Sequence, residues 1–113
     1  MVYQTNKEES ANIRKMMKEK YPDYKLGRNS HGKGTAYGWI HCDVIIPDRI
    51  SSGLTKDQVW NLGKPVYRDV LIATNRQNLK DDIMTDYFEV NTLFSIWTRK
   101  DWNERTGKNI KDW

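Results

Sequence analysis

The feature that most constrains this chain is the alternating run at residues 35–46. Side chains of a β-strand point to opposite faces in turn, so a period of two predicts one long strand. Small and apolar residues suited to a core occupy one face: Ala36, Gly38, Ile40, Cys42, Val44 and Ile46. The other face carries Tyr37, Trp39, His41 and Asp43. Pro47 ends the run, because proline has no N–H to donate to a neighbouring strand.

A shorter strand is predicted at residues 24–28, and residues 29–34 have the composition of a turn. Asn29, Gly32 and Gly34 in that cluster tolerate positive φ. We therefore expect a β-hairpin with a basic, glycine-rich tip. Gly27, near the end of the first strand, predicts a β-bulge that turns Arg28 towards solvent.

A capping box predicts where the first helix begins. Thr5 and Glu8 have the required spacing, and Pro22 ends the helix because the residue before a proline is disfavoured in the α region. The apolar face of this helix consists of Ala11, Ile13, Met16, Met17 and Tyr21. The cations Lys7, Arg14, Lys15 and Lys18 fall mostly on the opposite side.

The second half of the chain contains two further helix starts. A second capping box at residues 55–58 predicts a short helix that stops at Gly63. Residues 66–74 are predicted as a strand, with a helix as the alternative because Pro65 is also a helix-start signal. Residues 75–86 are polar, and the alternation at 88–96 predicts a final strand. Thr98 opens a last helix through Arg105, closed by Gly107.

The element order α-β-β-α-β-β-α predicts a single α+β domain over residues 1–113. We expect a small antiparallel sheet of three to four strands packed against two or three helices. A chain of 113 residues has the length of one ordinary domain.

Composition excludes several classes of protein. Five Trp, six Tyr and two Phe supply enough large apolar groups for a packed core, which argues against disorder. The longest purely apolar run is residues 70–73, only four residues, against roughly 20 residues for a bilayer span. We see no apolar segment of a signal peptide near Met1. The lone Cys42 cannot close an internal disulfide, so we expect a cytoplasmic protein.

The net charge of +4 is unevenly distributed. Residues 1–34 carry a net +4, residues 35–97 a net −2 and residues 98–113 a net +2. Cations gathered at the two ends are typical of contact with a polyanion. The alternative is a solvated helix face together with a charged tail.

Catalytic and metal-binding patterns are weak, and we expect no enzyme activity, metal or cofactor. His41 and Cys42 are neighbours on a strand, so their side chains point to opposite faces and cannot form a catalytic dyad. His41 and Asp43 do share a face, which leaves a small enzyme as a third alternative. The cluster of Asp81, Asp82 and Asp86 has the chemistry of a divalent-ion site, with a solvated loop as the alternative.

Cations and aromatic residues alternate from the first helix into the hairpin. Phosphates need cations and unpaired bases need aromatic platforms, so this mixture favours contact with nucleic acid. The candidate binding residues are Arg14, Lys15, Lys18, Lys20, Lys25, Arg28, His31, Lys33, Tyr37 and Trp39.

Two stretches resemble a known module. Residues 13–28, IRKMMKEKYPDYKLGR, form a basic helix, an aromatic-Pro step and a strand ending in Arg. Together with residues 82–87, DIMTDY, this pattern resembles the large-polyvalent-protein-associated domain of phages and conjugative elements. The resemblance covers about a fifth of the chain, and it implies an origin in a mobile genetic element rather than any activity.

These observations give one leading expectation and one runner-up. We expect a non-enzymatic phage or mobile-element protein that contacts nucleic acid or a nucleoprotein complex through its basic helix and hairpin. The alternative is an anti-CRISPR-like inhibitor that binds a host defence protein. The sequence leaves the oligomeric state open.

Overall fold

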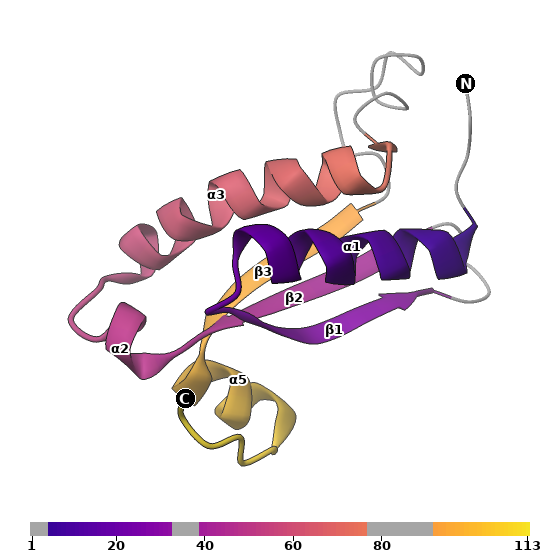
Figure 1. Ribbon diagram of the computed structural model, residues 1–113. Helices are drawn as coiled ribbons and strands as arrows, with labels where there is room; N and C mark the ends of the chain where they lie inside the picture. Colours follow the sequence, from indigo (N-terminus) through magenta and orange to yellow (C-terminus); the bar gives the residue numbers. More distant parts are fainter. Residues whose placement is uncertain (1–4, 33–38, 77–91) are drawn as a thin grey trace.

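The structure, a computed structural model, describes residues 5–32, 39–76 and 92–113 (Figure 1). The first helix, α1, spans Asn6–Lys20 and begins as predicted. The Glu8 backbone N–H donates to Thr5 Oγ1, and the Thr5 N–H donates to the Glu8 carboxylate. The capping box therefore fixes this end of the helix.

The predicted hairpin is confirmed, with a longer first strand than expected. Strand β1, Lys25–His31, pairs antiparallel with β2, Ile40–Ile46. Residues 29–31, predicted as part of the turn, belong to β1 and pair with residues 40–42 of β2. This ladder satisfies their backbone groups, while the Asn29 side-chain amide donates to the Ser10 carbonyl oxygen of α1 at 2.9 Å. The bulge predicted at Gly27 is also present, and Arg28 beyond it is exposed.

The prediction of a helix end at Gly63 followed by a strand at 66–74 is wrong, and the alternative of a helix at 66–74 is confirmed. After a short helix α2, Asp48–Ser51, the chain forms one long helix α3, Lys56–Ala73. Its buried face is formed at helical spacing by Val59, Gly63, Val66 and Val70. Pro65 cannot donate to the carbonyl oxygen of Asn61, but both residues are exposed, so water can satisfy that group.

The predicted antiparallel sheet is a mixed sheet, because its last described strand runs parallel to the neighbouring strand β2. Strand β3, Thr92–Thr98, pairs in parallel with β2, which gives the sheet order β1-β2-β3. Parallel neighbours need a long crossover connection, and α3 lies within that connection. The predicted α+β class is therefore confirmed, with a mixed sheet of three described strands and with four described helices where two or three were expected. Residues 88–91, predicted as part of the last strand, lie outside the described residues.

The last helix, α5, spans Arg99–Thr106 and has both predicted end signals. Thr98 Oγ1 accepts a hydrogen bond from the Asp101 N–H, and Gly107 ends the helix with φ 73°. A left-handed residue at this position favours glycine. Within the described ranges, no helix has both the length and the apolar character needed to cross a bilayer.

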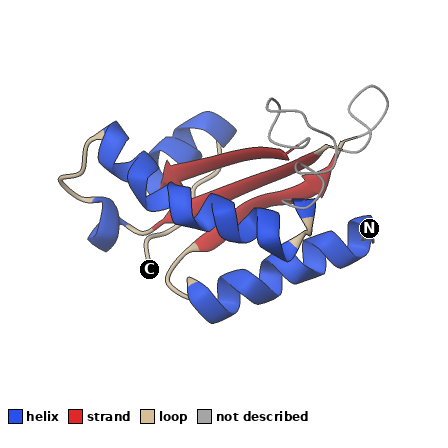
Figure 2. Ribbon diagram, turned by 90° about the horizontal axis from the view of Figure 1, so that it is seen from above, coloured by secondary structure: helices blue, strands red, loops and turns tan. Residues whose placement is uncertain are grey.

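The helices cover the sheet unequally. Figures 1 and 2 show α1 and α3 on one face and α5 on the other. The core lies under α1 and α3 and is formed by Ile13, Met16, Met17, Ile40, Cys42, Val44, Val66 and Val70. We call the opposite side of the sheet the α5 face. It carries the alternate residues of the three strands, Lys25, Arg28, Ser30, His41, Asp43, Ile45, Leu93, Ser95 and Trp97.

Candidate nucleic-acid interface

Three exposed cations form a stripe along the outer side of α1. Lys7, Arg14 and Lys18 are seven and then four residues apart. At about 100° per residue they lie within roughly 40° of one another around the helix axis. Ala11, predicted on the apolar face, is exposed and lies between them on the same side, whereas the buried Ile13 and Met17 point towards the core. We call Lys7, Arg14 and Lys18 the cationic stripe.

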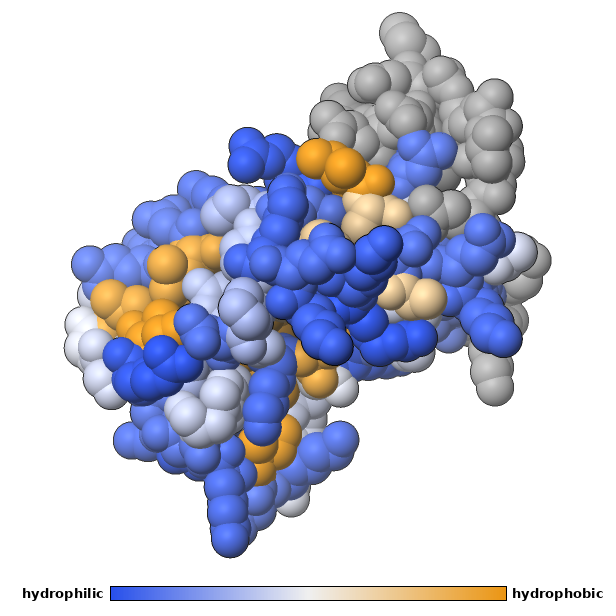
Figure 3. Space-filling view, viewed as in Figure 1, coloured by the Kyte–Doolittle hydropathy of each residue, from blue (hydrophilic) through white to orange (hydrophobic). Residues whose placement is uncertain are grey.

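The cations of the stripe have no counterion in the described part of the chain. None of the ion pairs between described residues includes Lys7, Arg14 or Lys18. Lys15, beside the stripe, is exposed and equally unpaired there. Figure 3 shows that hydrophilic side chains dominate the surface over α1 and β1. The stripe therefore offers positive charge to an external anion.

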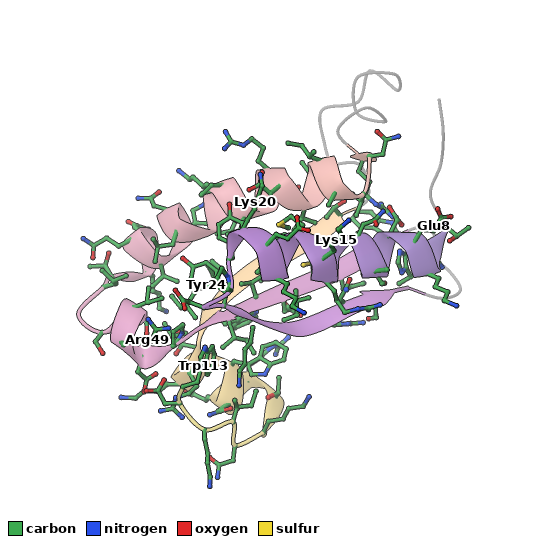
Figure 4. All side chains as sticks on the ribbon, viewed as in Figure 1. Glu8, Lys15, Lys20, Tyr24, Arg49 and Trp113 are labelled. Atoms are coloured by element: carbon green, nitrogen blue, oxygen red, sulfur yellow. The ribbon has the colours of Figure 1, made fainter. Side chains whose placement is uncertain are left out.

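Lys20, the last residue of α1, forms an ion pair within the protein. Its ammonium lies 3.4 Å from Asp69 Oδ1 of α3, and the Tyr21 hydroxyl donates to Asp69 Oδ2 at 2.6 Å. Figure 4 shows Lys20 at the end of α1 that lies nearest to α3. This predicted binding residue joins the two helices, so its charge is partly neutralised within the protein.

Tyr21 is expected to ionise well above the ordinary tyrosine pKa of 10.0. Burial, followed by the hydrogen bond to Asp69, raises the pKa of Tyr21 to about 12. Because the unfolded chain releases this proton first, the stabilisation from Tyr21 is complete below pH 10 and is lost as the pH rises from 10 to about 12. The ultraviolet titration of the wild type minus that of Tyr21→Phe should have its midpoint near pH 12, and a midpoint near 10 would contradict this contact.

Lys25 and Arg28 lie on the other side of the sheet from the buried side of α1. Lys25 Nζ is 4.4 Å from the ring centroid of Trp113, a cation–π contact. The exposed Arg28 donates from Nε to Ser30 Oγ at 3.0 Å. Trp39, half-buried, directly precedes β2, and its carbonyl oxygen accepts a hydrogen bond from the Gly32 N–H at 2.9 Å. The structure thus separates the predicted residues into an α1 group and an α5-face group.

His31 is not presented at the surface. Its side chain is 8% exposed, and Nε2 lies 2.8 Å from Glu9 Oε1. Arg76 donates to the same carboxylate from Nε at 2.7 Å and from Nη2 at 2.9 Å. His31 therefore belongs to a buried polar cluster beneath α1. Two other predicted residues, Lys33 and Tyr37, lie outside the described residues.

The residues of the enzyme alternative are placed as the sequence predicts. Cys42 and His41 lie on opposite faces of β2, and burial raises the pKa of the Cys42 thiol to about 12. Burial, and then the positive charge of Arg28, hold the pKa of His41 below its ordinary value. Asp43 Oδ1 accepts a hydrogen bond from Trp97 Nε1 at 3.0 Å. The acidic cluster of Asp81, Asp82 and Asp86 lies outside the described residues.

Lys7 is the cation of the stripe that the predicted site omits. Helical spacing alone places it beside Arg14 and Lys18, so the signal was present in the sequence. Comparison of this chain with family models, curated proteins and solved structures finds no match. The resemblance to the large-polyvalent-protein-associated domain therefore stays a prediction.

Proposed function

We propose that this protein binds nucleic acid by contacting the phosphate backbone with the cationic stripe of α1. The observation that carries the proposal is that Lys7, Arg14 and Lys18 share one exposed side and pair with no carboxylate of the described chain. Releasing the counterions of a polyanion is the main source of sequence-independent affinity for nucleic acid.

The spacing of the stripe supports contact with several phosphates. With a rise of about 1.5 Å per residue, Lys7 and Arg14 are about 10 Å apart along the axis, and Arg14 and Lys18 about 6 Å. The small side chain of Ala11 between them leaves room for a backbone to approach. Arg14 can form two parallel hydrogen bonds with one phosphate.

The hairpin supplies a second set of groups. Lys25 and Arg28 lie on β1, the edge strand beside α1, and Trp39 directly precedes the neighbouring strand β2. These residues add two cations and an aromatic ring on the hairpin to the three cations on α1. We propose a binding protein rather than an enzyme, since the Cys42 thiol is buried and the Asp43 carboxylate is held by Trp97.

Removing the stripe is expected to lower the salt dependence of binding. We would measure the affinity of labelled duplex and single-stranded oligonucleotides by fluorescence anisotropy over a range of salt concentrations. In the variant Lys7→Gln/Arg14→Gln/Lys18→Gln, the slope of log K against log salt for duplex DNA should shrink by about 2.7, because each lost phosphate contact contributes about 0.9.

The matched control removes the same charge elsewhere. Lys100, Arg105 and Lys108 are exposed residues of α5 and the following tail, and their triple substitution by Gln should leave most of the slope unchanged. Equal losses in the two variants would indicate a net-charge effect and contradict a site on α1. Absence of binding at low salt would also contradict the proposal and favour a protein partner, as in the anti-CRISPR-like alternative.

A further inference from the structure

Strand β3 has a sequence that is nearly the same in both directions. Thr92-Leu93-Phe94-Ser95-Ile96-Trp97-Thr98 places threonine at each end, two large apolar residues inside each end and serine at the centre. A strand with this symmetry presents the same classes of side chain to an antiparallel copy of itself.

The two edges of the sheet differ in how well they are protected. The sheet order leaves β1 and β3 as edge strands among the described residues. β1 carries Lys25, Arg28 and a bulge, features that discourage pairing with another strand. β3 contains no charged residue and no proline, and five of its seven residues are of types with high β-propensity. Of the two edges formed by the described strands, the β3 edge is therefore the one suited to pairing.

We propose that β3 pairs with β3 of a second copy of this chain, antiparallel, about a twofold axis at Ser95. In this register Phe94 faces Ile96 of the second copy and Leu93 faces Trp97. Aromatic residues opposite aliphatic ones are favourable cross-strand pairs. These pairs bring no charged residues together.

Exposed apolar side chains near this edge agree with such an interface. Leu93 is 48% exposed on the α5 face, and Trp60 of α3 is 42% exposed, with its ring centroid 6.3 Å from that of Phe94. Pairing at β3 would cover Leu93 with the Trp97 of the second copy. Since the charged β1 edge ends the sheet on both sides, the assembly closes at two copies instead of growing into a fibre.

The first test measures the mass in solution of the wild type and of one variant that disrupts the pairing. Light scattering after size exclusion should give about twice 13.4 kDa for the wild type. Ser95→Lys places two ammonium groups opposite each other at the axis and should give the mass of one copy. Ser30→Lys, on the protected β1 edge, should keep the double mass. Circular dichroism establishes that each variant is folded.

The second test needs no disruption of the interface. Opposite residues of an antiparallel pair have Cα atoms about 4.5 or 5.5 Å apart, a separation that a disulfide can bridge. Ser95→Cys should therefore link two chains under mild oxidation, whereas Ser30→Cys should not. The native Cys42 is fully buried and does not compete. A monomeric wild type at every concentration, or a dimer that Ser95→Cys does not link, would overturn the proposal.

Discussion

Replacing Glu9 by Gln is expected to lower the free energy of unfolding by about 3–5 kcal/mol, the usual cost of removing one partner of a buried ion pair. Glu9 is 5% exposed, and Arg76, whose guanidinium forms two hydrogen bonds with its carboxylate, is also 5% exposed. The substitution keeps the size of the side chain and removes only the charge. Arg76 would then stay buried without this counterion.

The buried cluster also joins three parts of the fold. Glu9 belongs to α1, His31 ends β1, and Arg76 follows α3. Loss of the carboxylate charge weakens the hydrogen bonds that hold these ends together, since bonds to an ionised acceptor are about twice as strong as neutral ones. The predicted loss therefore concerns global stability and not α1 alone.

Chemical denaturation with urea would measure the effect, and the neighbouring residue gives a matched control. Glu8→Gln makes the same chemical change at an exposed position and preserves the capping box, so it should change stability by less than about 0.5 kcal/mol. The double variant Glu9→Met/Arg76→Met, which removes both charges, should be more stable than Glu9→Gln. A Glu9→Gln protein as stable as the wild type would contradict the ion pair.

Features set by neighbouring residues could be predicted from the sequence. The capping residues Thr5, Thr55 and Thr98 each accept a hydrogen bond at the start of a helix, as their patterns indicate. The alternation in β2 places Ile40, Cys42 and Val44 in the core as expected. In both cases the determining interactions lie within a few residues, so a local pattern contains them.

Features set by distant contacts were predicted wrongly. Gly63 looks like a helix end, but its absent side chain makes room for β3, because an added Cβ would lie 2.7 Å from Ile96 Cγ2. Val66 and Val70 fit a strand and a helix equally well by spacing. The direction of β3 depends on how the chain crosses over the sheet after β2. None of these is decided within a short window of sequence.

The residues of the candidate site likewise divide into those placed by local periodicity and those placed by distant contacts. Periodicity along α1 predicts which cations are exposed. Arg14, Lys15 and Lys18 are exposed, as this periodicity predicts. It could not place His31, whose partner Glu9 is 22 residues away, nor show that Arg76 binds the same carboxylate across 67 residues. Lys20 likewise lies on the basic helix but binds Asp69 of α3. Whether a cation can bind an external anion therefore depends on its partners within the protein as much as on its charge.

Replacing Gly27 by Ala is expected to lower the free energy of unfolding by about 1–3 kcal/mol, the usual cost of overpacking a filled site. A Cβ at Gly27 would lie 2.6 Å from Trp102 Cζ2 and 2.8 Å from Cη2. Trp102 is 5% exposed and packs edge-on against Trp97, with ring centroids 5.9 Å apart. Because β1 is held by its ladder with β2, the indole must move, and α5 moves with it.

Urea denaturation and near-ultraviolet circular dichroism would measure the loss of stability and the changed tryptophan environment. Ser30→Ala on the same strand, where the side chain is exposed, should be close to neutral. The phenyl ring of Phe is smaller than the indole and relieves the close contact. Gly27→Ala should therefore lower the free energy of unfolding less in a Trp102→Phe background than in the wild type. An equal cost in both backgrounds would mean that the close approach of Trp102 is not the reason for glycine at this position.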